Sequence, residues 1–213
     1  DVESNVFGEV RGCLKTGKIK VNNLEKIKYL SSLYGAGFLT VTKHLENVPT
    51  PYSGQVALEH GSIAEDLANY YLISEQIPTG FKLSVFFDDK EAVKGAGGIF
   101  LQALPGADPK RVIEAEKMIK QIDSLGELYA KGQTPEAVIH DAFSDLNPHF
   151  LNSNRVEFFC RCSKDRMERY LKNLPVKDKK DMIKNGPFPV KLRCHHCNSV
   201  YKFSEDDLKV LGK

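Results

Sequence analysis

Four of the five cysteines in this 213-residue chain fall into two close pairs near its C-terminal end. The first pair, in FFCRCSK at 158–164, is separated by one residue, and the second, in RCHHCN at 193–198, by two. Alternate side chains of an extended segment point the same way, and a CxxC turn folds back on itself, so each pair can aim two sulfurs at one point. The spacing predicts one tetrahedral four-sulfur site, with zinc as the expected metal. The predicted ligands are Cys160, Cys162, Cys194 and Cys197.

The segment between the pairs has the length of a small folded unit. Thirty-one residues separate Cys162 from Cys194, enough for a helix over KDRMERYLKNL and a return strand. A unit of about 55 residues rarely folds on its apolar core alone. We therefore expect metal ligation to supply most of its stability, on the order of 10 kcal/mol, and loss of the metal to unfold it.

The sequence gives weaker evidence for other kinds of site. Free structural thiols would not need paired spacing, and the neighbouring pair His195 and His196 is expected outside the ligand set, because sulfur already fills four positions. Cys13 stands alone and is expected to be an ordinary thiol. The remaining histidines form no triad pattern, and GAGG at 95–98 lacks the lysine and the strand-to-helix context of a phosphate loop. No enzymatic activity is expected. The histidines in question are His44, His60, His140 and His149.

Charge is distributed unevenly along the chain. The net charge is +2, but the residues from Cys160 onward carry 14 Lys and Arg against 7 Asp and Glu, or +7, which leaves 16 against 21, or −5, for the remainder. Cations beside the cysteines favour thiolate over thiol. A basic segment also fits nucleic acid or simple solvation. The cations nearest the ligands are Arg161, Lys164, Arg166, Lys191 and Arg193.

Composition sets the expected compartment. No apolar run reaches the roughly 18 residues of a membrane span, and the first residues lack the pattern of a signal peptide. Five cysteines are too few for a secreted disulfide scaffold in a chain of this length. A cytoplasmic protein is expected.

The pattern before the cysteine module predicts an α+β fold. Strands are expected at 38–44, 54–60, 81–87 and 97–104. Ser62 and Glu65 form a capping box for one helix, whose apolar stripe is expected to pack in the core. That stripe consists of Ile63, Leu67, Tyr70 and Tyr71.

Residues 108–150 predict two amphipathic helices and no strand. Asp108-Pro109 and Thr134-Pro135 are helix start signals. Short helices are marginal alone and depend on what their apolar faces touch, so this region is a candidate conditional element. The first helix is expected to hold Val112, Met118, Ile119, Ile122 and Leu125 on one face, and the second Val138, Ile139, Ala142 and Phe143.

Three segments together resemble a known family, the redox-regulated heat shock protein 33 chaperones. They are C-x-C-x31-C-x-x-C at Cys160 to Cys197, YSGQVALEHGSIAEDLANYYLISEQIP at 52–78, and AGGIFLQALPGA at 96–107, in the family's order and across almost the whole chain. The resemblance implies a core α/β domain over 1–107, a metastable helical linker over 108–152 and a zinc-binding redox-switch domain over 153–213. It also implies an ATP-independent holdase that is inactive while reduced and bound to one zinc ion per chain.

The resemblance carries further expectations. After oxidation it implies disulfides Cys160–Cys162 and Cys194–Cys197, unfolded or partly folded client proteins as partners, and a homodimer, in protection against oxidative stress. Nucleic acid and membranes are not expected partners. Family members carry more core domain ahead of the point where this chain begins, and the chain opens without methionine, so an N-terminally incomplete core is expected.

Two alternatives stay open. A constitutive zinc ribbon that binds nucleic acid is supported by the basic segment, although few aromatic residues accompany the basic ones. A thiol oxidoreductase would need one reactive CxxC at a helix start, and the four-cysteine spacing argues against it.

Overall fold

The computed structural model describes residues 1–16, 33 and 35–211 of the chain. The described parts of 20–151 form one compact unit, and those of 1–19 together with 152–213 form another. Both units contain helices and strands, so the α+β class is confirmed. Among the described residues, none of the helices combines the length and apolar character that a bilayer crossing requires.

The unit within residues 20–151 is built on antiparallel strand pairs. Strands β5 (Thr79–Phe87) and β6 (Val93–Gln102) form a long hairpin, paired from Thr79↔Gln102 to Phe87↔Val93. Strands β3 (Phe38–Lys43) and β4 (Tyr52–Ala57) form a second pair. All four strands expected from the sequence are confirmed, with ends displaced by a few residues.

Helix α1 (Ile63–Ser74) begins at the predicted capping box, where Ser62 Oγ accepts from the Glu65 amide at 3.4 Å. Tyr70 is fully buried, and its hydroxyl donates to Glu75 at 2.8 Å. Glu75 also pairs with Lys43 of β3 at 2.6 Å, which ties the helix to the strand. Ile63, the first helical residue, is 49% exposed, so its predicted core position is wrong.

The region after β6 contains three α-helices where two were predicted. They are α2 (Pro109–Gln121), α3 (Leu125–Ala130) and α4 (Pro135–Ala142), followed by a short 3₁₀ turn at Ser144–Leu146. The expected caps at Asp108 and Thr134 are confirmed. The predicted first helix breaks because Ile122 is extended and Ser124 caps a new helix, accepting from the Glu127 amide at 3.3 Å. A local cap thus overrides the apolar periodicity.

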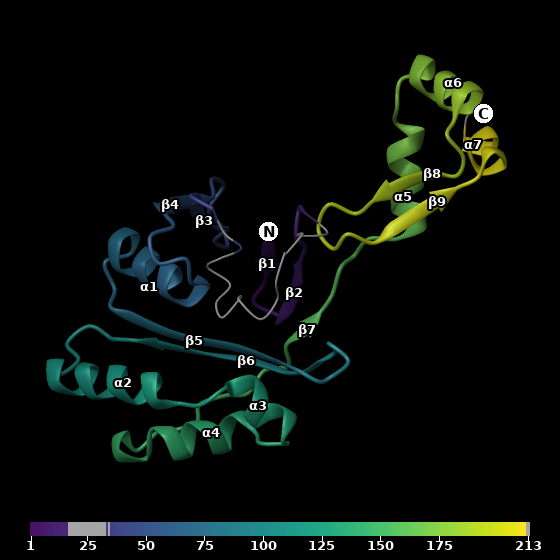
Figure 1. Ribbon diagram of the computed structural model, residues 1–213. Coiled ribbons are helices and arrows are strands. Elements are labelled where there is room, and N and C mark those ends of the chain that lie inside the picture. Colours follow the sequence, from purple (N-terminus) through teal and green to yellow (C-terminus); the bar gives the residue numbers. More distant parts are fainter. Residues whose placement is uncertain (17–32, 34, 212–213) are drawn as a thin grey trace. The chain divides into compact units, whose positions relative to one another are not determined.

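Helices α2 and α3 cover one face of the β5–β6 hairpin, α4 packs beside them, and α1 lies on the other side of the hairpin (Figure 1). Helix α3 approaches the strands closely because glycines line the contact. A Cβ on Gly95 would lie 2.0 Å from the Gly126 carbonyl oxygen, and one on Gly97 would lie 2.0 Å from the Tyr129 ring. The GAGG segment therefore provides room for a helix. The shared core consists of Ile99, Ile119, Ile122, Leu125, Val138 and Phe143.

The other unit combines a small sheet with the cysteine module. Strands β1 (Val2–Ser4), β2 (Glu9–Gly12) and β7 (Glu157–Phe158) form the sheet, in which β2 and β7 run parallel. The predicted helix and return strand of the module are confirmed as α5 (Lys164–Lys172) and β8 (Val190–Arg193). Helix α6 (Val176–Asn185), strand β9 (Val200–Phe203) and helix α7 (Glu205–Leu211) complete it.

Candidate metal centre

The four predicted cysteines meet at one point. The sulfurs of Cys160, Cys162, Cys194 and Cys197 all lie within 4.8 Å of one another, and all four are free thiols. Cys160 Sγ lies 3.7 Å from Cys194 Sγ, and Cys162 Sγ lies 3.4 Å from Cys197 Sγ. Among the described residues, no other cluster of three or more potential ligands of this kind occurs.

The first pair follows strand β7 and precedes helix α5. The Phe159 amide donates to the Val10 carbonyl at 2.9 Å, which extends the pairing with β2 to the edge of the site. Immediately after Cys162, Ser163 caps α5 by accepting from the Arg166 amide at 3.1 Å. A strand end and a helix cap therefore fix the two ends of the C-x-C segment.

The second pair lies in the turn between β8 and β9. The Cys194 amide donates to the Ser199 carbonyl at 2.8 Å, and the Asn198 amide donates to the Cys194 carbonyl at 3.0 Å. Asn198 has φ 60°, the left-handed conformation that lets the turn fold back. Cys194 is itself part of the buried core of the module, with Met167, Leu171, Phe203 and Leu208.

The arrangement suits a tetrahedral metal. Metal–sulfur bonds of about 2.3 Å at tetrahedral angles place sulfurs roughly 3.8 Å apart, close to the separations seen here. Four sulfur donors favour zinc or an iron–sulfur centre over hard cations such as magnesium. The four cysteines can therefore hold a metal ion.

The protonation of the sulfurs differs across the site. Burial raises the pKa of Cys160 to about 12 and also raises the pKa of Cys162, which accepts a 3.0 Å hydrogen bond from the Tyr201 hydroxyl. Burial also acts on Cys197, but its hydrogen bonds with Ser199 lower the pKa of Cys197 to about 6. A buried thiol such as Cys160 ionises at neutral pH only when a nearby positive charge compensates it, as a metal ion does.

Some neighbours of the cluster differ from the sequence-based expectation, whereas Cys13 lies apart from the ligand set as expected. Arg161 pairs with Glu9 at 2.7 Å and Lys164 lies 3.5 Å from Asp207, so these cations point to carboxylates. The Cys13 thiol donates to the His195 carbonyl at 3.1 Å and so lies beside the CxxC turn, outside the four-sulfur cluster. Tyr201 and Ser199, which touch the sulfurs, were not anticipated, since neither belongs to a ligand motif.

These features define a class of protein: the chain is an α+β protein with small sheets and a C-terminal module that contains a four-cysteine cluster. The sequence model described as Hsp33 protein matches residues 1–204. A 33 kDa chaperonin of Agathobacter rectalis is 38% identical over 210 residues, which cover 98% of this chain and 72% of that protein. One of Levilactobacillus brevis is 35% identical over 212 residues, which cover 99% and 71%.

A solved structure agrees with the sequence matches. The crystal structure of a 33 kDa chaperonin, or heat shock protein 33 homolog, from Thermotoga maritima matches with a TM-score of 0.82 at 31% identity, covering 99% of this chain and 71% of that one. The chain belongs to the Hsp33 family. The family named from the sequence motifs is thereby confirmed, and with it the chaperone class.

Proposed function

We propose that this protein is a redox-regulated, ATP-independent holdase that is inactive while reduced and metal-bound and becomes active on oxidation. The observation that carries the proposal is the four-sulfur cluster, because it joins two loops of a module with a small core of its own. One of the ligands, Cys194, is 3% exposed and belongs to that core. Losing the cluster would therefore also loosen the core.

The residues that would hold one zinc ion per chain are Cys160, Cys162, Cys194 and Cys197. When bound, zinc would cross-link the two cysteine loops and contribute on the order of 10 kcal/mol of folding free energy. Tyr201 orients the Cys162 sulfur through its hydroxyl, and Ser199 orients the Cys197 sulfur.

Oxidation would remove the ligand set. A peroxide accepts two electrons for each disulfide formed: one sulfur attacks the peroxide to give a sulfenic acid and one water, and its partner displaces the second water. The proposed disulfides are Cys160–Cys162 and Cys194–Cys197. Sulfurs of different pairs lie 3.7 Å and 3.4 Å apart, and a tetrahedral cluster makes all six separations similar, so proximity does not select the pairing.

The unfolded module would then affect the helices that precede it. We propose a core domain at 1–107, a linker at 108–152 and a redox-switch domain at 153–213. Helix α3 has 6 residues and α4 has 8, lengths that persist only while docked. Loss of the folded module, which follows the linker directly in the chain, would free its C-terminal end and expose apolar residues such as Val138 and Phe143 to clients.

The setting of this activity follows from the same chemistry. Reduced thiols and a metal centre fit the cytoplasm, where disulfides form only under oxidative stress. Unfolded or partly folded proteins are the proposed partners, with a homodimer in the oxidised state and with neither nucleic acid nor a membrane as a partner. Catalysis plays no part in this proposal.

Metal analysis and peptide mapping test the switch. Reduced protein should contain one zinc per chain, and peroxide should release it as Cys160–Cys162 and Cys194–Cys197 peptides appear. Cys13 should remain titratable throughout. Zinc that stays bound after all four thiols have reacted would rule out this mechanism.

A further inference from the structure

A hairpin far away in the sequence contacts the cysteine module. Strands β1 and β2, with the residues that follow to Leu14, form this hairpin, in which Glu3 stands opposite Arg11 and the two side chains form an ion pair. Its turn approaches β7 closely: Gly8 has φ +78°, and a Cβ there would lie 2.1 Å from the Arg155 carbonyl oxygen. The hairpin is therefore shaped to lie against the segment that leads into the first cysteine pair.

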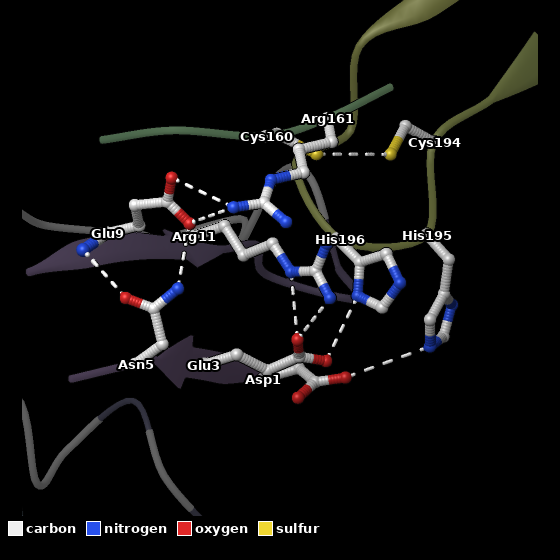
Figure 2. Close-up of polar contacts among 10 residues, drawn as sticks. All are labelled: Asp1, Glu3, Asn5, Glu9, Arg11, Cys160, Arg161, Cys194, His195 and His196. Carbon is white, nitrogen blue, oxygen red and sulfur yellow. Dashed lines mark hydrogen bonds and ion pairs between the residues drawn. The ribbon is translucent and has the colours of Figure 1, made fainter. Parts of the chain in front are cut away.

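The hairpin holds the residue between the ligands of the first pair. Glu9 accepts two hydrogen bonds from Arg161, at 2.7 Å and 3.0 Å, and Asn5 orients the same carboxylate with a 2.7 Å hydrogen bond (Figure 2). The bonds from Arg161 lower the pKa of Glu9, so its carboxylate stays charged at neutral pH. The hairpin therefore holds the side chain of Arg161, the residue that separates Cys160 from Cys162 in the sequence.

The same hairpin holds the residues between the ligands of the second pair. His196 Nδ1 lies 3.1 Å from Glu3 Oε1 (Figure 2), and the Cys13 thiol donates to the His195 carbonyl at 3.1 Å. One residue beyond the pair, Asn198 Nδ2 donates to the Leu14 carbonyl at 2.9 Å. Three separate contacts thus tie the CxxC turn to one short segment.

Arg11 holds Glu3 from the facing strand. Its Nε donates to Glu3 at 2.8 Å, and the two side chains form an ion pair. Arg11 therefore helps to keep the Glu3 carboxylate in place for its contact with His196.

We propose that the hairpin is a positioning element of the metal centre: it fixes the residues between the ligands of both cysteine pairs, and Arg11 holds Glu3 in place for its contact with His196. This role rests on the proposed function, because it presupposes that the four sulfurs hold a metal. Residues that orient ligands typically change metal affinity by about 10- to 100-fold when removed.

Zinc transfer from the reduced, zinc-loaded chain to a chromophoric chelator tests the carboxylates. Glu3→Gln and Glu9→Gln together should speed transfer about tenfold. Glu205→Gln is the matched control: it removes an exposed ion pair with Lys209, at 2.5 Å, in the same module but away from the ligands. The control should stay within about twofold of wild type. Transfer at the wild-type rate in the Glu3→Gln, Glu9→Gln variant would overturn the proposal.

Two substitutions at Arg11 test its hold on Glu3. Arg11→Gln should speed zinc transfer about tenfold and change the sulfur-to-metal charge-transfer band of the cobalt(II) form, whereas Arg11→Lys, which can still form an ion pair with Glu3, should stay within about threefold. Equal rates for the two variants would overturn the role of Arg11. Glu3 and Arg11 side chains are 44% and 29% exposed, so these changes leave the fold intact. A wild-type chain that binds neither metal would instead refute the proposed function.

Discussion

A substitution in the contact between α3 and the β5–β6 hairpin can test whether docking of the linker controls chaperone activity. A Cβ on Gly95 would lie 2.0 Å from the Gly126 carbonyl oxygen and 2.8 Å from the Ala130 amide nitrogen. Both are backbone atoms, so rotating a side chain cannot relieve the clash. Helix α3 would have to retreat by roughly 1 Å or more to restore ordinary contact. Gly95→Ala should therefore weaken the docking of α3.

The size of the effect follows from the overlap. Overpacking of this kind costs about 1–3 kcal/mol, and about 2 kcal/mol would raise the undocked population of α3 roughly 25-fold. Gly98→Ala is the matched control, because Gly98 lies on the opposite face of β6. Its Cβ would crowd Leu83 Cδ2, at 2.7 Å, the end of a side chain that is 45% exposed and free to turn away, and would lie in ordinary contact, at 3.4 Å, with the Lys82 carbonyl oxygen.

Hydrogen exchange and client aggregation, both in the reduced state, measure the outcome. In the reduced Gly95→Ala variant, the amides of residues 125–130 should exchange faster than in reduced wild type, and the variant should suppress client aggregation better. The Gly98→Ala variant should match wild type in both measurements. Unchanged protection of α3 would refute the packing argument. Faster exchange without any gain in holdase activity would show that undocking of the linker is not the activating event.

Three further predictions concern the sulfurs and one partly buried carboxylate, that of Glu75. Cys194→Ser should lower zinc content well below one per chain by metal analysis, whereas Cys13→Ser should leave it unchanged; equal loss would make Cys13 part of the site. Tyr201→Phe removes the 3.0 Å hydrogen bond to Cys162 and should speed zinc transfer about threefold. The hydrogen bond from Lys43, followed by that from Tyr70, lowers the pKa of Glu75 below 4.5. The ionised Glu75 carboxylate therefore stabilises the folded state above that pH, and this contribution disappears as the pH falls through the lowered pKa. Glu75→Gln should cost about 1 kcal/mol of unfolding free energy at pH 7 and progressively less below about pH 4.5, measured by urea unfolding.

Local signals account for what the sequence could predict. The caps at Ser62, Asp108 and Thr134 act within three residues, and the strands alternate with a period of two. The clustering of the four cysteines was predictable because each pair is set by backbone geometry over three or four residues. Such features need no knowledge of tertiary contacts.

Tertiary contacts account for what the sequence could not predict. The break before α3 is reinforced by a 2.7 Å hydrogen bond between Ser124 and Ser84, 40 residues apart. The GAGG segment was recognisable only as a poor phosphate loop, since its purpose is the close approach of α3. The contact of Glu9 with Arg161 spans 152 residues and leaves no local pattern.

The central claim is that oxidation of the cysteine cluster turns the protein into a holdase. Light scattering of a chemically denatured client, diluted into buffer without nucleotide, tests it most directly. Reduced, zinc-loaded protein should suppress aggregation poorly, and peroxide-oxidised protein should suppress it at near-stoichiometric amounts, with little dependence on salt because apolar surface captures the client. Equal suppression by both states would contradict the account, as would an oxidised protein that fails to protect the client while its reduced form binds DNA or RNA in a salt-sensitive manner.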